Sequence, residues 1–164
     1  MGAYRQLPRG VPGIGFELST ELELKPTGRA VRASEHQDGR TVGELEVEVF
    51  AAPLVIDRDG ILEARASERT GGSPAVKVSL PGASGYRAEA VGSAPLPYLY
   101  VFAMAPRNGV DGGVLVTVRC ARPDWPAAEA ALRSLRILTK YGTAPANDEQ
   151  LDDQLLLPLV GLRD

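Results

Sequence analysis

Residues 98–104 limit the choice of folds for this chain more than any other segment. They read Tyr-Leu-Tyr-Val-Phe-Ala-Met, so a β-strand formed by them would be apolar on both faces. Both faces would then have to be covered, which predicts a place at the centre of a sheet. A turn with two glycines at residues 111–113 follows, and the valine-rich residues 114–120 predict a neighbouring strand.

A helix is predicted over residues 124–138, after the second of these strands. Pro123 ends the strand, Asp124 is a favourable N-cap, and Pro126 lies in the first turn, where its missing N–H costs little. Apolar residues then recur at the spacing of one helix face. They are Trp125, Ala128, Leu132 and Leu135. We expect this face to pack on the sheet.

Residues 41–51 show the clearest alternation in the chain and predict a strand with one buried and one solvated face. The apolar side carries Leu45, Val47 and Val49. The polar side carries Glu44, Glu46 and Glu48. The turn residues Asp38 and Gly39 join this strand to residues 29–36 in a predicted hairpin, and Arg32 is expected to lie among the glutamates and offset their repulsion.

Shorter alternating segments predict further strands at residues 14–18, 76–80 and 86–90, the last two forming a second hairpin. Residues 54–69 instead carry apolar residues at helical spacing and predict a short helix. Gly60 interrupts that pattern at a cost of about 1 kcal/mol against alanine in a helix interior.

Together these patterns predict an α+β fold. We expect one domain over residues 14–141, in which an antiparallel sheet of six to eight strands carries the helix 124–138 on one face. The second, short helix lies near residues 54–69. Residues 1–13 are expected to be an irregular lead-in, and residues 142–150 a linker to a leucine-rich tail at residues 151–164. A length of 164 residues suits a single domain.

Charge and hydropathy exclude several classes of partner. The formal net charge is −3, which gives no electrostatic reason to bind nucleic acid or an anionic membrane surface. No apolar run approaches the roughly 20 residues of a membrane-spanning helix, and the first residues do not read as a signal peptide. We therefore expect no membrane insertion and a cytoplasmic protein.

Motifs of catalysis and metal binding are incomplete. His36 is the single histidine and Cys120 the single cysteine, too few for a zinc site or an intrachain disulfide. The segment around Ser84 lacks the second glycine of a nucleophile elbow, and no dinucleotide or phosphate-binding glycine motif is complete. We expect no catalytic residue, no metal and no cofactor, and we interpret Cys120 as a small buried apolar residue. An enzyme of unrecognised type would need a polar cleft around His36 or Ser84.

Two groups of residues are candidates for binding. Apolar residues end the chain in the leucine-rich tail, which either folds back on its own domain or occupies a groove on another chain. They are Leu155, Leu156, Leu157, Leu159, Val160 and Leu162. The second group would line a cavity for a small apolar ligand. It consists of Tyr86, Tyr98, Tyr100 and Met104.

The order of the elements carries a resemblance to a known family. Hairpin strands come first and a middle helix follows, then the sequence Val-Ser-Leu-Pro-Gly-Ala-Ser-Gly at residues 78–85. An aromatic strand, a Gly-Gly turn, a valine-rich strand and a final helix ending at residues 134–137 complete the series. This order resembles the PsbP-like α/β sandwich proteins, which include the Ran-binding Mog proteins and the LpqN-type lipoproteins.

The resemblance covers about residues 14–138 and implies a binding role, since most members act as adaptors, chaperones or assembly factors without catalysis. The family has no shared active-site motif, so no functional residue is carried over. The chain differs from the LpqN type in having no signal and no lipidation cysteine near residue 1, which puts an envelope role in doubt.

We therefore expect a non-enzymatic protein-interaction module, an adaptor, chaperone or assembly factor of a bacterium. Its partner would be another protein or a second copy of itself. A carrier of a small apolar ligand is the alternative. A structural subunit of a homo-oligomer, in which the tail is exchanged between copies, is a further one.

Overall fold

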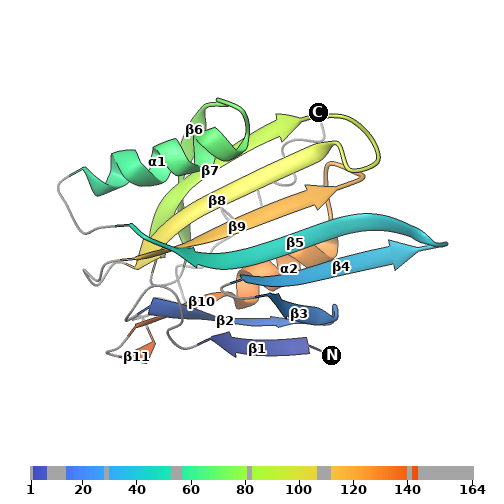
Figure 1. Cartoon of the computed structure of the whole chain (residues 1–164), viewed down its shortest axis with the longest axis horizontal. Helices are drawn as coiled ribbons and strands as arrows, with labels where there is room; N and C mark the ends of the chain where they lie inside the picture. Colours follow the sequence, from blue (N-terminus) through green and yellow to red (C-terminus); the bar gives the residue numbers. More distant parts are fainter. Residues whose placement is uncertain are drawn as a thin grey trace.

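The computed structural model describes residues 2–6, 14–27, 30–52, 57–80, 83–106, 112–139 and 142–143. These residues form two antiparallel sheets and two helices, which confirms the α+β class (Figure 1). The larger sheet has seven strands in the order β3-β4-β5-β9-β8-β7-β6, within the range expected from the sequence. The smaller sheet has the order β1-β2-β10-β11 and was not expected.

The larger sheet contains β3 (Leu24–Thr27), β4 (Ala30–Gln37), β5 (Arg40–Phe50), β6 (Ala75–Leu80), β7 (Ala83–Val91), β8 (Tyr98–Pro106) and β9 (Gly113–Cys120). The smaller sheet contains β1 (Gly2–Gln6), β2 (Ile14–Thr20), β10 (Arg136–Thr139) and β11 (Gly142–Thr143). The helices are α1 (Arg58–Arg69) and α2 (Pro126–Ser134).

The larger sheet separates two buried clusters. We call its sides the inner face, where Phe16, Val47 and Leu132 belong to one cluster, and the outer face, where Leu62 and Leu115 belong to the other. Strand β8 contributes to both clusters because it is apolar on both faces. In β8, Tyr100, Phe102 and Met104 are fully buried on the inner side, and Val101 and Ala103 on the outer side. The exact centre of the sheet is β9, one strand away from the predicted position.

The predicted hairpin at Asp38 and Gly39 is confirmed. Both residues have positive φ, 53° and 76°, which is the backbone of a tight turn matched to the twist of two strands. The turn joins β4 to β5, and Arg32 lies among the glutamates as expected, with Nη2 2.9 Å from Oε2 of Glu46. The second predicted hairpin is also present, as β6 and β7.

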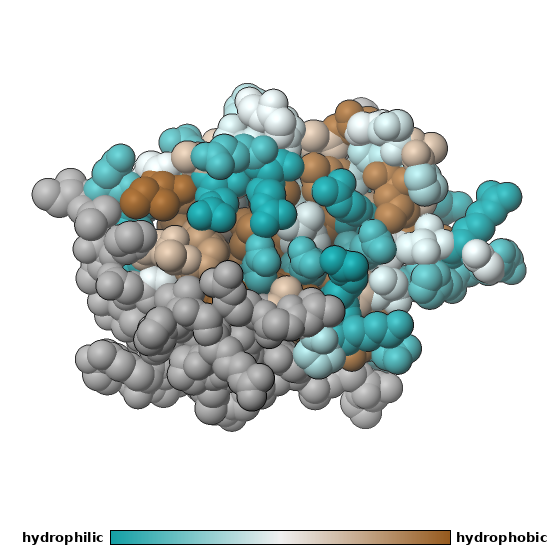
Figure 2. Space-filling model, in the orientation of Figure 1, coloured by the Kyte–Doolittle hydropathy of each residue, from teal (hydrophilic) through white to brown (hydrophobic). Residues whose placement is uncertain are grey.

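Helix α1 covers only part of the outer face. It begins at Arg58, inside the predicted range, and packs on β6, β7 and β8 (Figure 1). Leu62 and Ala66 are its buried residues. Leu115 of β9 and Phe50 of β5 belong to the cluster under this helix, whereas farther along the outer face Arg32 and Arg119 are exposed. Figure 2 shows hydrophilic residues on this part of the sheet. Of the described helices, neither has the length and apolar composition needed to cross a membrane.

The C-terminal helix is shorter than predicted. It ends at Ser134, and residues 136–139 are strand β10, paired with β2. The helical spacing that included Leu135 was misleading, because Leu135 and Ile137 also alternate with Arg136, the period of a strand. Leu135 already has extended backbone, with φ −66° and ψ 132°. The N-cap is Trp125 and not Asp124, with Pro126 in the first turn as expected.

Two of the predicted boundaries also change. The lead-in at residues 1–13 is not wholly irregular, because residues 2–6 form β1 and pair with β2 from Gly2↔Thr20 to Gln6↔Phe16. The expected linker, residues 142–150, begins with the short strand β11, which pairs with β10. The leucine-rich tail, residues 151–164, lies outside the described residues.

Candidate functional site

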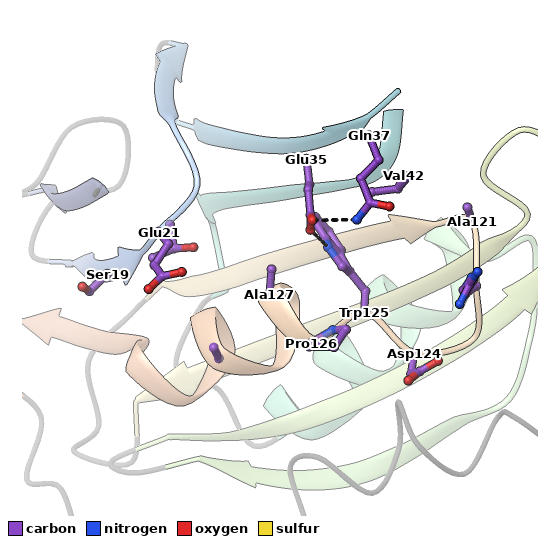
Figure 3. Close-up of a pocket in the computed structure, with 13 residues that line it drawn as sticks. Ser19, Glu21, Glu35, Gln37, Val42, Ala121, Asp124, Trp125, Pro126 and Ala127 are labelled. Carbon is purple, nitrogen blue, oxygen red and sulfur yellow. Dashed lines mark hydrogen bonds between the residues drawn. The ribbon is translucent and has the colours of Figure 1, made fainter. Parts of the chain in front are cut away.

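A pocket of about 890 Å³ lies where the N-terminal end of α2 meets the ends of β2 and β4 (Figure 3). We call it the Trp125 pocket. Three segments distant in the sequence, within residues 19–21, 35–42 and 121–130, contribute to its lining. The lining residues are Ser19, Thr20, Glu21, Glu35, Gln37, Val42, Ala121, Arg122, Asp124, Trp125, Pro126, Ala127 and Ala130.

The indole ring of Trp125 packs where Gly43 has no side chain. A Cβ at Gly43 would lie 2.5 Å from both Cδ2 and Cε2 of the indole, closer than such atoms ever approach. Gly43 of β5 thus leaves room for the ring to lie directly on the strand. As a result Trp125 is only 4% exposed, although it belongs to the segment that connects β9 to α2.

Glu35 places a carboxylate on the apolar side of β4. Val31 and Ala33 face the inner cluster, and Glu35 is the next residue on that side. Its Oε1 accepts a hydrogen bond of 2.7 Å from Nε1 of Trp125, so the indole N–H is satisfied. Its Oε2 accepts a bond of 3.2 Å from Nε2 of Gln37 (Figure 3).

An irregularity in the β4–β5 pairing lies beside this network. Glu35 pairs with Gly43 and His36 with Thr41, so Val42 has no partner in β4. A bulge of this kind bends a strand and changes the direction of its side chains. The carbonyl of Val42 accepts instead from N–H of Ala121 at 2.9 Å, which ties the start of the Trp125 segment to β5.

The charged groups of the Trp125 pocket are mostly acidic. Glu21, Glu35 and Asp124 contribute carboxylates, and Arg122 contributes the one guanidinium of its lining. Glu21 and Arg122 are exposed, whereas Glu35 and Asp124 are half-buried. Because like charges around one cavity add, the excess of carboxylates favours a cationic group over an anionic one inside it.

The opposite wall of the pocket is joined to α2 through Ser134. Its Oγ accepts from N–H of Ser19 at 3.0 Å and lies 2.7 Å from the Ser19 carbonyl oxygen. These contacts connect the last residue of α2 to the end of β2. Both ends of α2 are therefore fixed, one by Trp125 and the other by Ser134.

Cys120 lies at the end of β9, next to the pocket residue Ala121. It is 1% exposed, and its Sγ is 4.0 Å from the carbonyl oxygen of Tyr98. Burial, with a smaller contribution from the Asp124 carboxylate, raises the pKa of the thiol to about 12. The thiol is thus protonated near neutral pH, and the interpretation of Cys120 as a small buried residue is confirmed.

The residues expected to line a cavity are divided between the two faces of the larger sheet. Tyr98, Tyr100 and Met104 lie on the inner side of β8, whereas Tyr86 pairs with Ala103 and packs with the outer cluster. Tyr100 and Met104 are fully buried, and the Tyr100 hydroxyl donates to the carbonyl of Pro123. Burial also raises the pKa of Tyr100. None of the four lines the Trp125 pocket.

His36 and Ser84 are not brought together. His36 lies exposed on β4, with Nδ1 3.1 Å from the Thr41 hydroxyl, and Ser84 lies on β7, opposite Ala105 of β8. Three strands of the sheet separate β4 from β7. Across the described ranges, no three His, Cys, Asp or Glu side chains lie close enough to hold a metal ion.

A second, smaller cavity of about 200 Å³ lies on the open part of the outer face. Arginines and glutamates make up most of its lining, and Arg69 at the end of α1 donates to Glu48 at 2.9 Å. Its lining residues are Arg32, Glu44, Glu46, Arg69, Thr117 and Arg119. With three guanidiniums and two carboxylates, this cavity is nearly balanced in charge.

Sequence patterns do not reveal the Trp125 pocket, although they contain one sign of it. The inner series of β4 runs Val31, Ala33, Glu35, so a carboxylate stands where an apolar residue is expected. A half-buried acid on the apolar side of a strand needs a hydrogen-bond donor, which is the Trp125 indole. Comparison with protein-family models, with curated proteins and with solved structures finds no match to this chain.

Proposed function

We propose that the protein is a non-enzymatic protein-interaction module whose Trp125 pocket receives a basic segment of a partner protein. The acidic lining of a cavity of about 890 Å³ is the observation that carries this proposal. A cavity of that size accommodates a long side chain with its neighbours in a peptide. Carboxylates around it select Lys or Arg side chains and repel acidic ones.

The pocket is suited to binding because its walls are preorganised. Trp125 is seated on Gly43 and bonded to Glu35, and α2 is tied to β2 through Ser134. A rigid site loses little conformational entropy when a ligand enters. The resemblance to the PsbP-like proteins, whose members are mostly adaptors and assembly factors, supports the same role. We propose the bacterial cytoplasm as the place where the protein acts.

The leucine-rich tail is the second part of the proposal. Residues 155–162 would dock in an apolar groove, either on this domain or on the partner. The test compares partners captured by the full chain and by a chain that ends at Thr143, because an earlier end would remove β11. Identical sets of captured proteins would remove the tail from the proposal.

Trp125 itself reports on the pocket, because it is the single tryptophan of the chain. Titration with a lysine- and arginine-rich peptide is expected to shift its fluorescence, and the affinity is expected to fall as salt is added. A peptide with glutamate in place of each basic residue is the control. Equal responses to the two peptides, or no response to the basic one, would contradict the proposal.

A matched pair of variants locates the binding. Glu21→Gln removes an exposed carboxylate of the pocket, and Glu63→Gln removes an exposed one from α1. The first is expected to weaken binding of the basic peptide by about 2–5-fold, the effect of one exposed charge. The second is expected to change nothing. Equal effects of the two substitutions would place the binding elsewhere.

A carrier of a small molecule is the second candidate. The cavity volume also falls within the usual range of small-molecule sites, and apolar groups of Val42, Trp125 and Ala130 line part of it. Native mass spectrometry separates the two functions. A bound small molecule that survives purification and leaves when basic peptide is added would favour the carrier over the interaction module.

A further inference from the structure

Strand β6 is an edge of the larger sheet and is less protected than the opposite edge. Among the described strands it pairs on one side only, with β7 (Figure 1). The opposite edge, β3, has four residues and contains Pro26, features that prevent further pairing. By contrast, β6 has six residues, no proline and one charge, at Lys77.

On the inner side of the sheet, β6 itself carries Val76 and Val78. Val76 is 49% exposed and Val91 of the neighbouring strand is 72% exposed, and these are the exposed large apolar residues of the described segments. Val76 pairs with Arg87, which together with Val91 faces the inner side of the sheet. Arg87 forms an ion pair with Glu89 on the same side of β7. Lys77 points to the outer side, with Nζ 3.9 Å from Oδ2 of Asp59 in α1.

We infer that β6 pairs antiparallel with β6 of a second copy of this chain, joining two seven-stranded sheets into one. A second copy is the partner because the strand can pair with itself. Residues directly opposite each other in a sheet face the same side, so in a two-fold dimer one residue must lie opposite its own copy. If this central residue is Lys77 or Val78, five residue pairs form within β6.

Charge decides between these two registers. A centre at Lys77 would place two lysines directly opposite each other, which is unfavourable. A centre at Val78 places Val78 opposite Val78 and Lys77 opposite Ser79, and Val76 meets position 80. The apolar residues then match along the inner side and the polar residues along the outer side. The register centred on Val78 is therefore the one we propose.

Light scattering on the full chain tests the pairing. One chain has a mass of 17.4 kDa, and we expect the weight-average mass to rise toward twice this value as concentration increases. The rise should be gradual, because a five-pair strand contact is small beside a standard stable interface of about 1,600 Å². A mass of one chain up to the solubility limit would overturn the inference.

Two exposed valines provide a matched pair of variants. Val76→Lys puts a charge on the edge that meets the second copy, and we expect it to abolish the increase in mass. Val91→Lys makes the same change on β7, outside the paired strand, and should leave dimer formation unchanged. Both positions are exposed, so neither substitution threatens the fold. Equal behaviour of the two variants would count against β6 as the interface.

Disulfide formation fixes the register. In a chain carrying Cys120→Ala, Val78→Cys should cross-link two copies upon oxidation, since opposite Cα atoms in a sheet lie within about 4.5–5.5 Å. Cross-linking through Lys77→Cys in its place would overturn the proposed register. A dimer that forms only after residues 144–164 are removed would mean that these residues occupy the free edge of β6 in the full chain. This result would overturn the inference. The basic-peptide titration of the Trp125 pocket is independent of all these outcomes.

Discussion

The indole ring of Trp125 occupies the space that a side chain on Gly43 would need. A Cβ at residue 43 would lie 2.5 Å from Cδ2 and 2.7 Å from Cε3 of the ring. The pocket thus depends on two residues far apart in the sequence, Trp125 and Gly43, and Gly43 is needed because it has no side chain.

Gly43→Ala is expected to displace Trp125. The added methyl group has no room, so the ring must move and the free energy of unfolding should fall by about 1–3 kcal/mol. Tryptophan fluorescence should shift to longer wavelength as the indole meets water, and urea unfolding gives the change in stability. Gly92→Ala is the control, because the nearest atom to its Cβ would be 3.9 Å away. Equal stability of the two variants would contradict this account.

Glu35→Ala is expected to destabilise the protein by about 1–3 kcal/mol, because the buried indole N–H loses its acceptor. Glu35→Gln keeps an acceptor oxygen in the same place and should cost less. The control is Glu44→Ala, which removes a glutamate from the open outer face. Urea unfolding followed by tryptophan fluorescence measures all three. If the alanine and glutamine variants lose the same stability, the hydrogen bond does not hold the ring.

Alkaline pH is expected to weaken the fold through two buried groups. The pKa of Cys120 is raised from 9.0 to about 12, and that of Tyr100 is raised above 10.0. Above pH 9 the unfolded chain therefore loses protons that the folded protein still holds, so the free energy of unfolding falls as pH rises. The stabilisation is complete below pH 9 and is lost progressively toward pH 12.

Thermal unfolding measured between about pH 8 and pH 11 checks this dependence. The fall in stability should be shallower for Cys120→Ala and for Tyr100→Phe than for the unmodified protein. Ser84→Ala removes no titrating group in this range and serves as the control. A fall that is equally steep in all the variants would assign the alkaline sensitivity to other groups.

Leu132→Ala is expected to lower the free energy of unfolding by about 2–5 kcal/mol, as for other buried leucines. The side chain is 1% exposed and belongs to the inner cluster. Ala130→Ser, on the exposed side of the same helix, should change stability by less than about 0.5 kcal/mol. Denaturant unfolding compares the two, and a loss below 1 kcal/mol for Leu132→Ala would mean that α2 contributes little to the core.

Local patterns predicted the larger sheet well because most of its strands and turns have a characteristic residue pattern of their own. The positive φ of Asp38 and Gly39 is encoded by those residue types, and the glutamates of β5 show which side is solvated. The smaller sheet has no such signal. Residues 2–6 show no clear alternation of apolar and polar residues. Residues 134–139 fit a helix and a strand equally well. In both segments the strand conformation is determined by pairing with β2.

The candidate site was harder to predict, for a physical reason. Its cavity exists only where the ends of β2, β4 and α2 meet, and no single segment carries its shape. Gly43 reads in sequence as one position of an alternating strand, and nothing local pairs it with Trp125. Glu35 was the one visible sign, since a carboxylate in an apolar series needs a partner from elsewhere.

The pairing of β2 with β10 has a consequence for the synthesis of the protein. Ser19 and Ser134, which hold this region together, are 115 residues apart. On the ribosome β2 therefore emerges long before β10, and at about 5–20 residues per second it waits several seconds for its partner. During that interval Phe16 and Leu18, buried in the finished protein, lack part of their cover. A nascent chain stalled before residue 136 should therefore be sensitive to proteases and prone to aggregate, whereas one released after Thr143 should not.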